Sequence, residues 1–265
     1  MHRIRHLPAH RPASAAPALV AVAHGSRDPR TPHAVAALLD RVRELRPGLD
    51  VRIGHIELNT PLLPDALDAL GAGEAVLVPL LLGRGHHVKH DIPASVAAAP
   101  ALRARVAAPL GPHPLLVEAL HDRLAEAGWD GSGRGDRGTA VVLAAAGSRD
   151  PESAADARHT ARLLGERLGG VPVVPAYASA ASPTVPAAVR ALAARGHRRI
   201  AVASYFTAPG RFASAAAAHA PWIAAAPLGA HPALARLLLH RYDEARAAGA
   251  ALCDIPMNTR FAASA

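Results

Sequence analysis

The chain has 265 residues, of which 51% are hydrophobic and 3% aromatic, and it carries a formal net charge of +8 at pH 7. This length can bury a sizeable core, either in one large domain or in two small ones, and the composition excludes fibrous and disordered proteins. The single cysteine excludes an internal disulfide and a multi-cysteine metal site, so any metal must be held by histidine and carboxylate.

The positive charge is scattered along the chain, and aromatic side chains that could stack on bases are scarce. We therefore expect no nucleic-acid partner, and a polyanionic small molecule would explain the excess charge equally well. No apolar run approaches membrane-spanning length, so no membrane partner is expected. Residues 1–16 are predicted to form a disordered basic tail. They are not read as a secretion signal, because the apolar run that follows leads directly into the first strand, and the expected location is cytoplasmic.

Short aliphatic runs alternate with longer amphipathic ones, a pattern typical of βαβ units and a parallel sheet. The strands predicted for the first half are 18–23, 51–58, 74–82 and 105–108, and the helices are 32–46, 61–70, one that begins after Asp91, and 114–127. Asp91 is the expected N-cap of the third helix, with Pro93 in its first turn. The stretch 128–138, dense in glycine and polar residues, is the predicted linker.

After the linker the pattern restarts, so the sequence contains an internal repeat. "HGSRDP" at 24–29 returns as "AGSRDP" at 146–151, and "VAAPLGPHPLLVEAL" returns as "AAAPLGAHPALARLL". We predict an α/β fold of two tandem domains, 17–127 and 139–249, followed by a C-terminal tail, 250–265. Each domain is expected to be a small parallel sheet flanked by helices, the two being related by internal duplication across a cleft.

In an open parallel sheet, ligands bind beyond the carboxyl ends of the strands. His24 follows the first strand and Glu57 ends the second, where a carboxylate must be paired or functional because unpaired burial is costly. The loop "GRGHHVKH", 83–90, follows the third strand.

Within this loop, His86 and His90 have the i, i+4 spacing of ligands on a helix. We reject that pair, because the helix is expected to begin only after Asp91. His86 or His87 is then expected to act from a loop whose glycines allow a bulky ligand to approach the backbone.

The second copy lacks all three candidate ligands. His24 aligns with Ala146, Glu57 with Ser179 and His87 with Phe212, whereas "GSRDP" and "APLGxHP" persist. The coordinated loss predicts one functional set in the N-terminal copy and a second copy retained for structure. By the same argument, His113 and His231 of the persistent "PLGxHP" are interpreted as structural.

The segments "HGSRDP", "IELNTP" at 56–61 and "GHHVKHDIP" at 85–93 resemble motifs of the sirohydrochlorin chelatase family, whose members insert iron, cobalt or nickel into related tetrapyrroles. The resemblance covers roughly residues 18–248. It implies that His24 and His87, rather than His86, are catalytic and bind the metal, with Glu57 as a further ligand.

The chemistry suits these residues, because neutral imidazoles bind Fe, Co or Ni without the grip of a thiolate site and exchange protons near neutral pH. No organic cofactor is expected, and the divalent metal, Fe2+ or alternatively Co2+ or Ni2+, is a substrate. The tetrapyrrole, sirohydrochlorin or a relative, carries many carboxylates. Its predicted binding residues are Ser26, Arg27, Arg84, Gly85 and Lys89.

Two alternatives to a ferrochelatase remain at the sequence level. One is a cobaltochelatase of cobalamin synthesis, and the other is a carrier that binds metal or tetrapyrrole without turnover. Phosphate transfer is disfavoured, because "HGSRDP" lacks a glycine-rich cradle with a lysine. The chain is expected to be a monomer with pseudo-twofold symmetry and one metal site.

Overall fold

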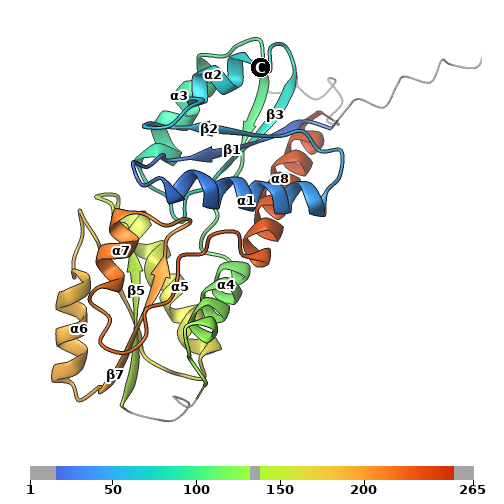
Figure 1. Ribbon diagram of the computed structural model, residues 1–265. Helices are drawn as coiled ribbons and strands as arrows, with labels where there is room; N and C mark the ends of the chain where they lie inside the picture. The colour runs from blue at the N-terminus through green and yellow to red at the C-terminus, as the bar shows by residue number, and fades with distance from the viewer. Residues whose placement is uncertain (1–15, 132–137, 254–265) are drawn as a thin grey trace, which may run out of the picture.

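The computed structural model describes residues 16–131 and 138–253, which form two parallel sheets (Figure 1). The first sheet has four strands in the order β2-β1-β3-β4, and the second has three in the order β6-β5-β7. The strands are β1 (Ala18–Ala23), β2 (Val51–His55), β3 (Glu74–Pro79), β4 (Arg103–Val106), β5 (Thr139–Ala145), β6 (Val173–Tyr177) and β7 (Arg199–Tyr205). The predicted α/β architecture with a duplicated sheet is confirmed.

Helices flank both sheets. They are α1 (Arg30–Leu45), α2 (Leu63–Asp68), α3 (Ile92–Ala97), α4 (Pro114–Glu126), α5 (Pro151–Arg167), α6 (Val185–Ala194), α7 (Arg211–Ala217) and α8 (Pro232–Cys253), and a π-helical turn, η1 (His87–Asp91), directly precedes α3. Among the described residues no helix is both long and apolar enough to cross a membrane.

Several predicted element limits were wrong. The second strand stops at His55 and the third at Pro79, and α8 continues to Cys253, past the predicted start of the tail at 250. Asp91 is not an N-cap, because its backbone is helical and its side chain caps no N–H of α3. The other predicted tail residues, 1–15 and 254–265, and the linker core 132–137 lie outside the described residues.

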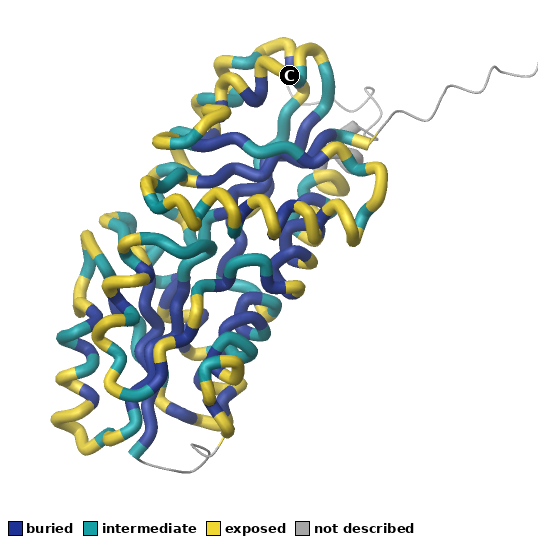
Figure 2. The backbone as a smooth tube through the Cα atoms, viewed as in Figure 1, coloured by how far each residue is buried: buried dark blue, intermediate teal, exposed yellow. Residues whose placement is uncertain are grey.

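Strand β1, one of the two inner strands of the first sheet, and β5, the central strand of the second, are buried along their whole length, and Figure 2 shows the two buried stripes. A strand covered on both faces by helices reads as a continuous aliphatic run rather than an alternating one. This explains why "ALVAVA" at 18–23 and "AVVLAAA" at 140–146 are similar, because each strand packs between two layers of helices.

Two helices are exchanged between the halves (Figure 1). Helix α4, predicted to close the first unit, packs against α5 and β7 of the second half, while α8, from the end of the chain, packs against α1, β3 and β4 of the first. The exact domain limits stay a prediction, but these contacts show that each half is completed by a helix from the other.

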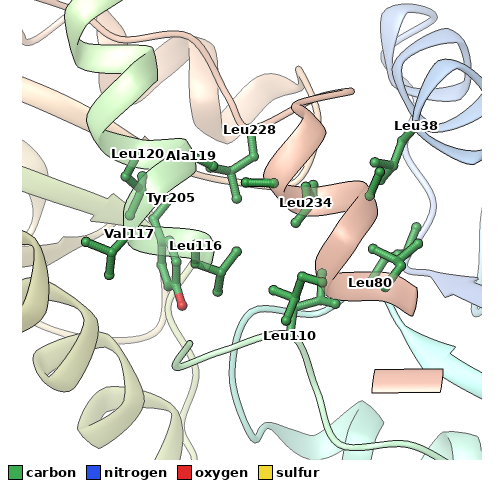
Figure 3. Close-up of a cluster of buried hydrophobic side chains, with 14 of the residues drawn as sticks. Leu38, Leu80, Leu110, Leu116, Val117, Ala119, Leu120, Tyr205, Leu228 and Leu234 are labelled. Carbon is green, nitrogen blue, oxygen red and sulfur yellow. The ribbon is translucent and has the colours of Figure 1, made fainter. Parts of the chain in front are cut away.

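One hydrophobic cluster therefore runs through both halves. Figure 3 shows Leu38 of α1 and Leu80 beside α8, and side chains of α4 such as Leu116 near Tyr205 of β7. Separate clusters lie on the outer faces of the sheets, under α2 and α3 in the first half and under α6 in the second. The shared cluster makes the two halves a single packing unit.

The persistent "PLGxHP" is a helix-start motif. His113 Nδ1 accepts a hydrogen bond from the Leu115 N–H (3.1 Å) at the start of α4, and His231 Nδ1 accepts one from the Ala233 N–H (3.2 Å) at the start of α8. Burial lowers the pKa of both histidines, which favours the neutral, accepting ring. The structural interpretation of these two histidines is confirmed.

Candidate functional site

The two copies of "GSRDP" form the same tight loop after the first strand of each half. Gly25 has φ +102°, and a Cβ there would lie 1.8 Å from the Glu57 carbonyl oxygen. Gly147 has φ +91°, and its Cβ would lie 1.9 Å from the Ser179 carbonyl oxygen. Only glycine allows this approach, so the motif is retained in both halves for backbone packing.

The serine and aspartate of the motif also have loop roles. The Ser26 hydroxyl accepts a hydrogen bond from the Asp28 N–H (3.1 Å), and the Ser148 hydroxyl accepts one from the Asp150 N–H (3.1 Å). This conserved internal geometry explains how the second copy could keep five letters of the motif while losing its histidine.

The loop of the first copy and the turn η1 bring His24 and His87 together. Their Nε2 atoms are 3.1 Å apart, and the rings are nearly perpendicular, at 87°. The side chains are 47% and 35% exposed, so both are accessible from solvent. Residues 63 positions apart in the sequence thus present two nitrogens to one point, as the strand-end argument predicts.

Each of these histidines has a carboxylate on its other nitrogen. Asp91 Oδ2 lies 2.5 Å from His87 Nδ1, and Glu57 Oε1 lies 3.5 Å from His24 Nδ1. The hydrogen bond to Asp91 fixes the tautomer and the ring orientation of His87 and leaves its Nε2 for the ligand, whereas Glu57 lies only within ion-pair distance of His24. Glu57 is exposed, so the argument from its burial was wrong. Its role as a direct metal ligand stays a prediction that requires the side chain to move.

Sequence reasoning missed the role of Asp91. His87 and Asp91 are i, i+4 neighbours on the helical turn η1, and that spacing was a usable signal. The turn begins at His87, so the stated reason for rejecting His86 and His90 was also wrong. Those two rings lie against each other instead, with centroids 4.6 Å apart, and His86 is 71% exposed.

The histidine pair is spaced for one metal ion. Two nitrogens bound to the same ion at about 2.1 Å are separated by roughly 3.0–3.4 Å, which includes the distance seen here. Among the described residues no group of three or more His, Cys, Asp or Glu side chains is arranged as a finished metal site. The geometry therefore supplies two protein nitrogens and leaves the remaining positions of an ion open.

A cavity of about 940 Å³ lies between the halves and includes this pair. Its volume is at the upper end of the ~300–1,000 Å³ typical of small-molecule sites. The first half contributes His24, Glu57 and His87, and the second contributes Tyr177, Phe206 and Phe212. The histidines thus come from the first half, and most of the aromatic rings that line the cavity come from the second.

The second copy lines the same cavity with the residues that replaced its ligands. Ala146, Ser179 and Phe212 all line it, and the Ser179 hydroxyl donates to the Ala146 carbonyl (3.1 Å). These side chains offer a methyl, a weak donor and a phenyl, so the second half supplies a wall and no counterpart of the histidine pair.

The predicted substrate-binding residues have different surroundings. Ser26, Arg27 and Gly85 line the cavity, and among the described residues no ion pair of Arg27 is found. Arg84 and Lys89 instead form ion pairs with carboxylates of α5 and its N-cap. The pKa of Lys89 is raised by its hydrogen bonds to these carboxylates.

Comparison with known proteins gives the following matches. The CbiX family matches residues 18–127 and again 140–245. The sirohydrochlorin ferrochelatase of Bacillus subtilis is 30% identical over 173 residues, 63% of this chain and 64% of that one. The sirohydrochlorin ferrochelatase of Priestia megaterium is 27% identical over 242 residues, 84% and 88% of the two chains. The sirohydrochlorin cobaltochelatase of Methanococcus aeolicus is 37% identical over 79 residues, 29% and 55%. The first and last of these matches span less than two thirds of the relative.

Solved structures show the same fold. SirB from Bacillus subtilis with Fe3+ has a TM-score of 0.70 at 24% identity, covering 89% of this chain and 98% of that one. CbiX, described as the terminal enzyme for biosynthesis of siroheme in denitrifying bacteria, has a TM-score of 0.64 at 23% identity, covering 86% and 99%. Because the family matches each half separately and together most of the chain, this protein belongs to the CbiX family and contains two copies of its domain.

Proposed function

We propose that this chain is a sirohydrochlorin chelatase that inserts Fe2+ into the polycarboxylated tetrapyrrole. The observation that carries the proposal is the pair of Nε2 atoms, 3.1 Å apart, on one wall of a cavity large enough for a macrocycle. The relatives in the family are named sirohydrochlorin ferrochelatase and cobaltochelatase.

His24 and His87 first hold the ion. With the His87 Nδ1–H donated to Asp91, the Nε2 of a neutral His87 ring is an acceptor, so the His24 Nε2–H donates to it before the ion binds. When the ion arrives, His24 must present a lone pair at Nε2. Its proton then belongs on Nδ1, which faces Glu57. Glu57 therefore favours the tautomer of His24 that binds metal.

The same nitrogens then serve as bases. Insertion of a divalent ion releases two protons from the pyrrole nitrogens. As the ion moves to the macrocycle, each Nε2 regains a free lone pair and can accept one of them. Imidazoles suit this exchange because they bind such ions without the grip of thiolates.

The cavity walls orient the macrocycle. Phe206 and Phe212 line the cavity from the second half, where a macrocycle can pack against them, and the exposed Arg27 can pair with substrate carboxylates. Ser26 and Gly85 add polar and backbone contacts. We propose one such site per chain, in a monomer with pseudo-twofold symmetry.

Turnover with purified protein tests this function. Sirohydrochlorin is incubated with Fe2+ under anaerobic conditions, and with Co2+ and Ni2+ in separate arms, while the visible spectrum is followed. A chelatase forms metallated product in excess of enzyme, whereas a carrier stops at one equivalent. SirB from Bacillus subtilis is solved both with Fe3+ and with cobalt, so the rates with the two ions decide between ferrochelatase and cobaltochelatase.

The histidine variants locate the site. His24→Ala and His87→Ala should abolish insertion with the far-UV CD spectrum unchanged, whereas His86→Ala should be much milder. Turnover that depends on His86 and survives loss of His87 would contradict the proposed site.

A further inference from the structure

The segment that carries His87 is held by carboxylates of the second half. Arg84, three residues before His87, contacts Asp156 of α5 at three points: through its backbone N–H (2.9 Å), Nε (3.1 Å) and Nη2 (2.6 Å). The Asp156 side chain is only 3% exposed. A carboxylate buried to this extent depends on its cation, because loss of one partner leaves an uncompensated charge.

Lys89, two residues after His87, is held in the same way. Its Nζ lies 2.6 Å from Asp150 Oδ2 and also pairs with Glu152. Glu152 additionally accepts from Arg84 Nη1 at 3.0 Å. The turn with His87 is therefore anchored on both sides by cations of the first half and anions of the second.

The second half contains the counterpart of this turn, around Phe212, and among the described residues its contacts with the first half form no comparable network of ion pairs. By the alignment that pairs His87 with Phe212, Arg84 corresponds to Pro209 and Lys89 to Ser214. There, the Thr31 hydroxyl donates to the Pro209 carbonyl (2.6 Å), and Arg30 Nη2 donates to the Ser214 hydroxyl (3.2 Å). The concentration of charge is thus specific to the turn that carries a histidine.

We propose that Asp150, Glu152 and Asp156 are positioning residues for His87, so that the half without ligands fixes the geometry of the metal site in the other half. The proposal rests on the proposed function of His87. It assigns Arg84 and Lys89 to this network rather than to substrate carboxylates. A shift of the turn by about 1 Å would separate the two Nε2 atoms beyond the span of one ion.

Two variants test it in the full-length chain, Asp156→Asn and Glu152→Gln. Each removes one negative charge with little change in side-chain size. Co2+ alone is titrated into each variant and followed by its visible absorption, and kcat and KM are then measured for Co2+ and for sirohydrochlorin. Groups that orient a ligand without touching the metal typically change affinity about 10- to 100-fold, and we expect a rise of that size in the Kd and KM for Co2+. The KM for sirohydrochlorin should stay near the wild-type value.

Asp243→Asn is the matched control. Asp243 on α8 pairs with both terminal nitrogens of Arg46 on α1 (2.6 and 2.7 Å), away from the residues that line the cavity. It should lower the Tm without changing the Co2+ affinity.

The outcomes separate the alternatives. If Asp156→Asn and Glu152→Gln lower only the Tm, as the control does, the network is purely structural and the proposal is overturned. If Lys89→Met raises the KM for sirohydrochlorin and leaves the Kd for Co2+ unchanged, Lys89 binds substrate and the proposal is likewise overturned. Should Asp156→Asn fail to fold, Glu152→Gln and Lys89→Met decide by the same readouts. Absence of metallated product from the wild-type protein with Fe2+, Co2+ and Ni2+ alike would instead refute the proposed function.

Discussion

Because the two halves share one hydrophobic cluster, we predict that a destabilising substitution in the first half lowers the stability of the second half as well. Leu38 on α1 is 1% exposed and belongs to the cluster that runs through both halves. Replacing it with alanine should cost about 2–5 kcal/mol, the range for buried leucine truncations. With an m-value of about 3 kcal/mol/M in urea, the unfolding midpoint should fall by roughly 1 M.

The two tryptophans provide the assay. Trp129, just after α4, and Trp222, in the second half, are the only ones in the chain, and their ring centroids are 5.6 Å apart. Urea unfolding is followed in parallel by tryptophan fluorescence and far-UV CD. Leu38→Ala should shift both transitions equally. Leu192→Ala, in the cluster under α6, is the positive control for the fluorescence signal. A fluorescence midpoint that stays at the wild-type value while the CD trace becomes biphasic would refute a common core.

Three further predictions concern the loop, the helix caps and the metal count. Gly25→Ala and Gly147→Ala should both lower the Tm, because each new Cβ would lie within 2 Å of a carbonyl oxygen. Only Gly25→Ala should abolish Co2+ binding, measured by isothermal titration calorimetry. Equal Co2+ affinities in the two variants would contradict this. Burial lowers the pKa of His113 and His231 below 6.5, so the unfolded state takes up protons first as the pH falls. The free energy of unfolding should therefore be greatest above about pH 6.5 and decline below it. His231→Asn can still cap the helix but does not titrate, so it should flatten this decline. An unchanged pH profile in this variant would count against the capping role of His231. Titration with Co2+ should reveal one saturable site per chain that His24→Ala removes, whereas two equivalent tight sites would refute the single-site model.

Much of the site follows from sequence because of one geometric rule. Carboxyl ends of parallel strands meet at one edge, so the residue after β1 and the segment after β3 had to be close, and His24 and His87 are. The internal repeat gave a second criterion for choosing site residues. The candidate ligands are absent together from the second copy, whereas residues that the loop itself requires, such as Gly25 and its counterpart Gly147, are present in both copies.

Other features were not available from the sequence. The periodicity of 114–126 and 232–253 shows that each helix has an apolar face but does not say which sheet it covers, so the exchange of α4 and α8 could not be predicted. Arg84 and Lys89 look like free cations in a sequence, and only the structure shows the carboxylates of α5 beside them. Asp91 was predicted to be a helix N-cap because an aspartate before Ile-Pro is typical of a helix start. Its side chain instead forms a hydrogen bond with the His87 ring, one turn earlier.

The exchange of helices has a consequence for synthesis on the ribosome. The side chains that form the histidine pair and its carboxylates are all translated by residue 91, but α8, which covers β3 and β4, is translated only after the strands of both sheets. Until α8 emerges, that face of the first sheet has no cover, and until β7 emerges, α4 has no second sheet to pack on, so the nascent chain exposes apolar surface while most of its length is made. A stop codon between residues 92 and 232 would therefore deprive the protein of a stable site without removing His24, Glu57, His87 or Asp91.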